Sequence, residues 1–98
     1  MNNDAFEWDE AKNRTNRSKH GIAFELAQEA FADPFCLTFP ESQMETEERF
    51  WTIGRVGELT VMVVVHTLWD DRGEEVARII SARKATPRER RIYEEIDE

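Results

Sequence analysis

The chain has 98 residues, a formal net charge of −8 and one cysteine, Cys36. This acidity argues against a general nucleic-acid coat protein, which would be basic, and one cysteine excludes an internal disulfide. No apolar run approaches the roughly 18 residues of a transmembrane helix, and the acidic N-terminus lacks a secretory signal. We therefore expect a single cytoplasmic domain over residues 1–98, with no membrane contact. We expect no cofactor and no metal site, because two histidines and one cysteine at these spacings do not resemble zinc ligands.

The first third of the chain predicts one strand and two helices. Residues 5–8 form a short apolar run that is typical of a strand. Asp9 is a predicted N-cap and Gly21 a predicted C-terminal cap, which together define a helix over residues 10–20. This helix is mostly polar, so we expect it to lie on the surface. Residues 22–33 have apolar positions at helical spacing and predict a second, amphipathic helix.

The rest of the chain is predicted to be rich in strands. Apolar and β-branched runs predict four of them, over residues 35–39, 49–54, 59–68 and 76–83. The acidic stretch 41–48 has no periodicity and predicts a solvated loop. Thr86, Pro87 and Glu89 have the spacing of a capping box that opens a terminal helix. The resulting order, β-α-α-β-β-β-β-α, predicts an α+β fold in which an antiparallel sheet carries its helices on one side.

Basic residues gather near the C-terminus of this acidic chain. Residues 76–93 contain a single acid, Glu89, and six bases: Arg78, Arg83, Lys84, Arg88, Arg90 and Arg91. Arginines in the first turns of a helix are unfavourable for its macrodipole, so helix stability does not explain them. A strand end and a helix start crowded with bases suit an anion or phosphate site. The alternative, that these are solvated surface charges, remains open from the residues alone.

The position of each arginine on its strand limits how they can act together. Arg78 and Arg83 lie five positions apart, an odd number, so in a regular strand their side chains point to opposite faces. They can enter one cleft only if a bulge or a twist at the strand end intervenes. Otherwise we expect Arg78 to lie on the other face or to pair with an acid.

Aromatic residues and histidines allow both structural and functional interpretations. His66 ends an apolar run, where a histidine is more often a hydrogen-bonded core or rim residue than a catalyst, although its ordinary pKa near 6.5 suits acid–base work. His20 is most simply a partner of a helix C-terminus. One of the three tryptophans, if exposed beside the basic cluster, could stack a nucleobase, but the sequence does not identify which.

Long stretches of the chain resemble the BrnT family of type II toxins. The likeness lies in the opening "FEWDEAKN" and "KHGI", in "EERFWTIGRVGELTVMVVVHT", and in the ending "RIISARKATPRERRIYEE". The resemblance implies a RelE-like fold, with an antiparallel sheet, two N-terminal helices and a short C-terminal helix. It also implies a ribonuclease that blocks translation by cutting RNA. The implied partner is a BrnA-type antitoxin, a ribbon-helix-helix protein, and promoter DNA is then bound only through the antitoxin complex.

The resemblance also implies a set of site residues for metal-free RNA cleavage. In that reaction a 2′-hydroxyl attacks the adjacent phosphate, which requires a base, an acid and cations that stabilise the developing charge. The predicted catalytic residues are Arg83, Arg78, Lys84, His66, Glu48 and Arg49, with His66 or Glu48 as the base. The predicted RNA- and phosphate-binding residues are Lys19, His20, Arg88 and Arg91.

Some features depart from the family pattern. Members are often basic, whereas this chain is acidic, and Leu68 and Trp69 stand where a polar or charged residue is expected. These departures bear on RNA affinity and activity, and they leave an alternative function open. In it, the chain is a non-catalytic binding module whose basic face docks an acidic partner protein.

Overall fold

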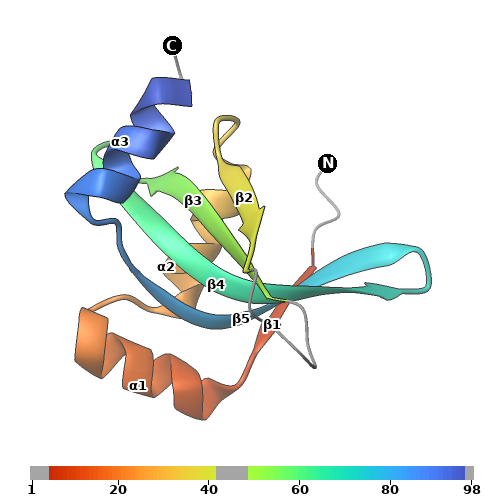
Figure 1. Cartoon of the computed structure of the whole chain (residues 1–98). Helices are drawn as coiled ribbons and strands as arrows, with labels where there is room; N and C mark the ends of the chain where they lie inside the picture. The colour runs from red at the N-terminus through yellow and green to blue at the C-terminus, as the bar shows by residue number, and fades with distance from the viewer. Residues whose placement is uncertain (1–4, 42–48, 97–98) are drawn as a thin grey trace.

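The computed structural model describes residues 5–41 and 49–96 (Figure 1). Three α-helices, a 3-10 helix and five strands follow one another in this part of the chain. They are β1 (Ala5–Trp8), α1 (Glu10–His20), α2 (Phe24–Ala27), the 3-10 helix η1 (Gln28–Ala32), β2 (Leu37–Pro40), β3 (Phe50–Val56), β4 (Thr60–Asp71), β5 (Glu74–Lys84) and α3 (Pro87–Ile96). This order confirms the predicted α+β fold. No described helix is long and apolar enough to span a membrane.

The five strands form one sheet in the order β1-β5-β4-β3-β2. Three of its strand pairs are antiparallel, whereas β1 runs parallel to β5. The expectation of a wholly antiparallel sheet is therefore wrong at β1. A parallel pair needs a long connection, and here nearly the whole chain separates the two strands. That pairing lies beyond the reach of local sequence patterns.

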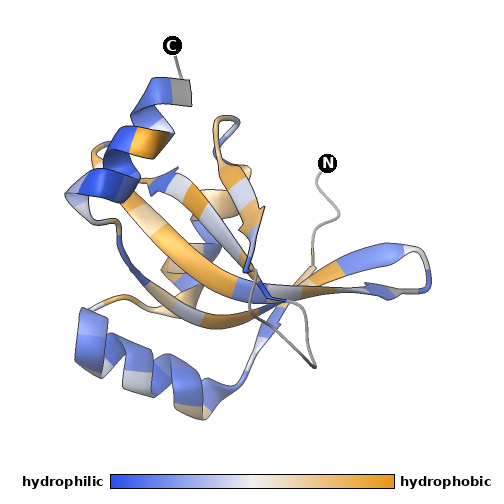
Figure 2. Ribbon diagram, viewed as in Figure 1, coloured by the Kyte–Doolittle hydropathy of each residue, from blue (hydrophilic) through white to orange (hydrophobic). Residues whose placement is uncertain are grey.

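Helices cover both faces of the sheet, although the sequence predicted them on one side. On the first face, which we call the covered face, α2 and η1 enclose Phe24, Ala30, Val64 and Ile79. Alternate residues of the same strands point the other way, and there α3 packs its buried Tyr93 against Ile53, Val61 and Val63. Figure 1 shows α2 behind the sheet and α3 in front of it, and Figure 2 shows the apolar central strands between them. We call the second face, beyond the contact with α3, the open face.

Helix α1 closes the edge of the sheet where β1 ends. β1 pairs only with residues 76–79 of β5. Beyond them, the side-chain amide of Asn16 donates to the carbonyl oxygen of Ala82 at 2.9 Å and accepts from its N–H at 3.2 Å. The Asn16 amide thus supplies Ala82 with the two hydrogen bonds that a neighbouring strand would otherwise provide. It also donates to the carbonyl oxygen of Ile22 at 2.9 Å, which fixes the chain just after the helix.

The polar composition of α1 conceals two buried residues. The predicted caps are confirmed: the Asp9 carboxylate accepts from the N–H of Ala11 at 2.8 Å, and Gly21 has φ 71°. Asn16 and Asn13 are nevertheless only 5% and 1% exposed. The Asn13 side-chain oxygen accepts from the N–H of Phe24 at 2.8 Å and so anchors the start of α2. The prediction of a purely surface helix is therefore wrong on this side, because hydrogen bonds rather than apolar contacts hold it.

The predicted second helix changes character partway along. It is α-helical only over Phe24–Ala27 and then tightens into η1. At this point η1 lies directly against β3, since a Cβ atom added to Gly54 would lie 2.4 Å from the carbonyl oxygen of Ala30. Only glycine permits this approach. Asp33 then ends the segment in an extended conformation, as the Asp33-Pro34 pair predicted.

Candidate functional site on the open face

A bulge in β5 determines which side chains share the open face. Val65 of β4 pairs with Ser81, but the next residue, His66, pairs with Ile79, so Ile80 is an extra residue in the strand. One extra residue reverses the alternation of side chains. Arg78 and Arg83 therefore point to the same face. From their spacing, the two arginines were expected to enter one cleft only with such a bulge or with a twist at the strand end.

Arg83 lies between a carboxylate and an aromatic ring. Its Nη1 and Nη2 atoms donate to the two Glu89 oxygens at 2.7 Å and 2.9 Å. Its guanidinium carbon lies 5.8 Å from the centre of the Trp51 ring, a cation–π distance. This answers which tryptophan stands beside the basic cluster. The Arg83 side chain is 33% exposed and that of Glu89 is 16% exposed, so the pair borders solvent.

Glu89 is in turn fixed by the predicted capping box. Its carboxylate accepts from the N–H of Thr86 at 2.9 Å, and its own N–H donates to the Thr86 hydroxyl at 3.2 Å. The Arg83 guanidinium lowers the pKa of Glu89 to about 2, aided by the bond from Thr86 and opposed by burial. The Glu89 carboxylate likewise raises the pKa of Arg83. Sequence reasoning assigned Glu89 only to the cap, although it is the one acid among the six bases of residues 76–93.

Arg78 occupies the other end of the open face. Its Nη1 atom lies 3.1 Å from a carboxylate oxygen of Glu7, which is its register partner on β1. The two side chains are 45% and 39% exposed, so this pair contributes little to stability. The pairing confirms that Arg78 meets an acid. Arg78 and Arg83 share a face, but each makes its ion pair at a different place on it.

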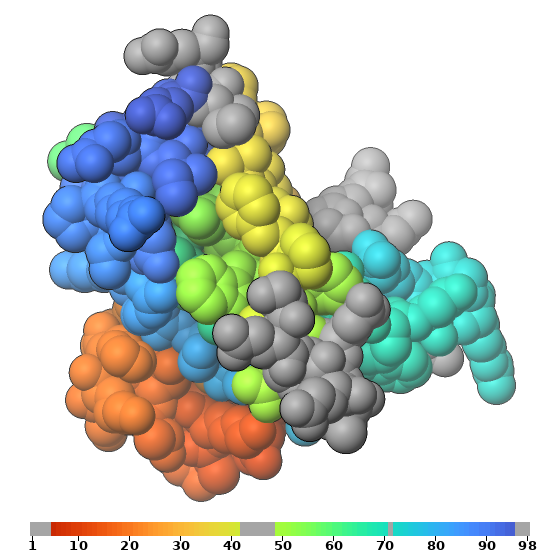
Figure 3. Space-filling model, in the orientation of Figure 1, coloured from red at the N-terminus to blue at the C-terminus, as the bar shows by residue number. Residues whose placement is uncertain are grey.

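The other basic residues of the cluster lie around the start of α3. Lys84, Arg88 and Arg91 are exposed. Arg90 lies 3.6 Å from Glu94 in an exposed pair one helical turn away. In Figure 3 the open face is seen between α1 and α3. Arg83 is thus the most enclosed cation of a loosely arranged group.

Arg49 stands on the same face, just before β3. It lies two positions before Trp51, so in extended backbone the two side chains point the same way, and it is half-buried. Its Nε atom is buried and has no hydrogen-bond partner among residues 5–41 and 49–96. The neighbouring candidate, Glu48, and the other residues of the predicted acidic loop from 42 onward lie outside the described residues.

His66 lies on the covered face and is only 1% exposed. Its Nε2 atom is 2.8 Å from the Thr52 hydroxyl, which in turn lies 2.9 Å from the Thr38 hydroxyl. Its Nδ1 atom is 3.3 Å from the carbonyl oxygen of Thr67, so we assign the proton to Nδ1 and the acceptor role to Nε2. Burial lowers the pKa of His66. The sheet therefore separates this candidate base from Arg83, and its surroundings match the structural interpretation.

Lys19 and His20 are exposed at the end of α1. They line a depression of about 280 Å³ against Ile80 and Ser81 of β5. This depression follows the seam between α1 and the sheet edge and shares no lining residue with the surroundings of Arg83. The structure thus brings neither residue into contact with the Arg83–Glu89 pair.

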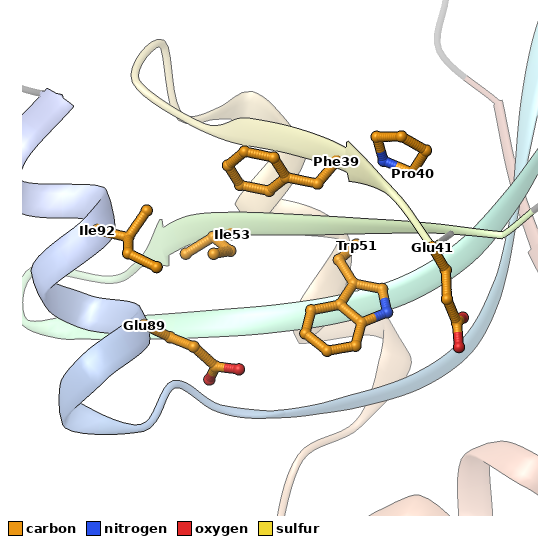
Figure 4. A pocket seen from close by; sticks show the side chains of 7 residues that line it. All are labelled: Phe39, Pro40, Glu41, Trp51, Ile53, Glu89 and Ile92. Atoms are coloured by element: carbon orange, nitrogen blue, oxygen red, sulfur yellow. The ribbon is translucent and has the colours of Figure 1, made fainter. Parts of the chain in front are cut away.

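A groove of about 510 Å³ on the open face is lined by the two contact residues of Arg83, Trp51 and Glu89. Its apolar walls come from β2, β3 and α3, namely Phe39, Pro40, Trp51, Ile53 and Ile92. Two carboxylates, Glu41 and Glu89, complete it (Figure 4). Phe39 is 41% exposed and Ile92 40% exposed, which is unusual for large apolar side chains. Within the described residues, no group of three or more His, Cys, Asp or Glu residues is placed to hold a metal ion.

The fold is that of a RelE-like α+β domain. A sequence model of the family described as "Ribonuclease toxin, BrnT, of type II toxin-antitoxin system" matches residues 8–89, and the chain belongs to this BrnT family. The crystal structure of the Brucella abortus ribonuclease toxin BrnT is similar, with a TM-score of 0.63 and 29% sequence identity. The match covers 87% of this chain and 99% of the Brucella chain. Comparison with curated protein sequences gave no significant match.

Proposed function

We propose that this chain is an active endoribonuclease that cuts RNA without a metal ion and thereby inhibits translation in the cytoplasm. A BrnA-like ribbon-helix-helix antitoxin neutralises it, and promoter DNA is bound only through the antitoxin complex. The observation that carries the proposal is Arg83, held on the open face by Glu89 and Trp51 within the residues that match the family.

The proposed reaction is an internal transesterification of RNA. A base removes the proton of the 2′-hydroxyl, the 2′-oxygen bonds to phosphorus, and the bond from phosphorus to the 5′-oxygen breaks. An acid supplies a proton to the departing 5′-oxygen, so the products are a 2′,3′-cyclic phosphate and a 5′-hydroxyl. Arg83 stabilises the negative charge that develops on the phosphate oxygens, which is the role that preorganised cations fulfil in such reactions.

The remaining residues receive roles according to their positions. Arg49 and Arg78 add positive charge along the open face, and Lys84, Arg88 and Arg91, which lie around the start of α3, guide the RNA backbone toward it. Glu48 is the base that the family resemblance implies, and it lies outside the described residues. We assign His66 a structural role, because it is buried on the covered face and its ring nitrogens have partners.

The test is cleavage of a defined RNA by the purified chain in EDTA. We expect cleavage to persist, with cyclic phosphate and 5′-hydroxyl ends, and expression without the antitoxin to arrest growth and protein synthesis. Activity that disappears on chelation and returns with a divalent ion contradicts the metal-free mechanism. Folded protein that leaves RNA intact and growth unimpaired favours the non-catalytic binding module instead.

A further inference from the structure

The hydrogen bonds of Arg83 leave one edge of its guanidinium available. A guanidinium has five N–H donors. Nη1 uses its two, on Glu89 and on the carbonyl oxygen of Lys84 at 3.3 Å, and Nη2 uses one on Glu89. The Nε–H and the second Nη2–H have no partner within residues 5–41 and 49–96. These two donors lie parallel on the same edge, and such a fork matches two oxygens of a phosphate.

Glu89 keeps this fork in a fixed orientation. Four hydrogen bonds hold it, two from Arg83 and two exchanged with Thr86, so moving its carboxylate away from Arg83 would also break the bond from the Thr86 N–H. We therefore regard Glu89 as a positioning residue rather than a removable block. The guanidinium is further supported by the Trp51 ring at 5.8 Å.

The same Trp51 ring forms a wall of the groove beside β2 and α3. The groove volume of about 510 Å³ lies within the roughly 300–1,000 Å³ of small-molecule sites. Phe39 and Ile92 expose apolar surface along this groove, at 41% and 40%. An aromatic and apolar groove next to a phosphate fork has the two parts that a single-stranded nucleotide requires, a stacking surface and an anion site.

We propose that this groove is a nucleotide subsite, in which one unpaired base of single-stranded RNA lies against Trp51 while its phosphate binds the free edge of Arg83. The inference rests on the proposed function, because it identifies the substrate contact of the same face. A purely apolar peptide of the antitoxin suits the groove less well. It would leave the Arg83 fork unused.

Binding of a mononucleotide tests the subsite without any cleavage step. Adenosine 3′-monophosphate and inorganic phosphate are titrated into the chain labelled with ¹⁵N, and the indole N–H signals of the three tryptophans are followed. We expect the nucleotide to bind roughly 5- to 100-fold more tightly than phosphate, as one stacked base predicts. The Trp51 signal should shift most.

Two matched variants sharpen the test. Trp51→Leu should lose the advantage of the nucleotide over phosphate and retain phosphate binding, whereas Trp51→Phe should keep part of it. Trp69→Leu is the control, because Trp69 is an exposed tryptophan on the same face, four residues beyond the partner of Trp51 along β4. Arg83→Lys keeps the charge that balances Glu89 but removes the fork, so it should weaken both ligands at least 10-fold.

The outcomes separate this inference from the proposed function. A nucleotide that binds no more tightly than phosphate, or equal effects of Trp51→Leu and Trp69→Leu, overturns the subsite. RNA cleavage by Trp51→Leu with an unchanged KM also overturns it, while the ribonuclease proposal stands. A Trp51 signal that responds to the antitoxin but not to the nucleotide assigns the groove to the antitoxin and equally rejects the inference.

Discussion

The polar residues on the two faces of the sheet differ in burial and in how fully their hydrogen-bonding groups are paired. On the covered face, His66, Thr52 and Thr38 form a hydrogen-bonded chain in which His66 and Thr52 are almost inaccessible to solvent. On the open face, Arg83 and Glu89 pair at the border of solvent, and Arg83 keeps donors in reserve. Buried polar groups with satisfied partners specify a core. Polar groups that are held in place but keep hydrogen-bond donors unpaired, as Arg83 does within the described part of the chain, are suited to binding a ligand.

The largest expected effect is the loss of Arg83. Arg83→Ala should lower the rate of RNA cleavage by about 10²–10³-fold, because one cation that stabilises the developing charge is removed, and growth arrest should be lost. The same change leaves the Glu89 carboxylate without its partner, so it should also destabilise the fold by about 2 kcal/mol. Growth without antitoxin and thermal melts measure the two effects.

Arg90→Ala is the matched control for this change. Its partner Glu94 is exposed and the pair is long, at 3.6 Å, so both activity and stability should be nearly unchanged. If Arg83→Ala arrests growth like the parent, or if Arg90→Ala is the more damaging of two folded variants, the active face has been misplaced.

Asn16 tests how the sheet edge is closed. Asn16→Ala removes the partners of both backbone groups of Ala82 and of the Ile22 carbonyl. We expect a loss of about 3 kcal/mol in the free energy of unfolding, since buried polar groups are left unpaired. Urea denaturation measures it, and Thr15→Ala, which removes an exposed hydroxyl bond on the same helix, is the control. Similar losses for the two variants would show that Asn16 does not act as a strand substitute.

Acid should weaken the open face by a smaller amount. The pKa of Glu89 is lowered from its ordinary value of 4.5 to about 2 in the folded chain. Its contribution is therefore complete above about pH 4.5 and is lost as the pH falls toward 2. We expect about 2 kcal/mol to disappear across that range, after allowing for partial solvent screening. Denaturation at several pH values should be flatter for Glu89→Gln, and an identical slope would refute the assigned pKa.

Local patterns predicted the parts of this molecule that depend on neighbouring residues. The caps at Asp9 and Gly21 and the capping box of Thr86 and Glu89 require only short-range hydrogen bonds, and all are confirmed. The order of helices and strands along the chain also followed from periodicity. The strands predicted over residues 59–68 and 76–83 are confirmed as β4 and β5, but both extend farther than their apolar residues, to a tight turn at Arg72 and Gly73. The polar ends of these two strands are held together by backbone pairing up to the turn.

Features that depend on distant residues could not be predicted in this way. The bulge at Ile80 leaves no mark in the sequence, yet it places Arg78 and Arg83 on one face. The parallel pairing of β1 and the placement of α3 opposite α2 depend on the whole chain. The burial of Asn13 and Asn16 was hidden because hydrophobic periodicity detects only apolar contacts. Glu89 was assigned to the cap, and its second partner, Arg83, is visible only in three dimensions.

The most direct test of the difference between the two faces is the single-turnover cleavage rate of one defined RNA by two variants. Arg83→Lys keeps the charge on the open face but loses the guanidinium fork, and His66→Gln keeps an acceptor for Thr52 on the covered face. We predict that Arg83→Lys reduces the rate at least about 10²-fold. His66→Gln should stay within about threefold of the parent and lower only the stability. A His66→Gln variant that folds but does not cleave, beside an Arg83→Lys variant that cleaves normally, would contradict the account.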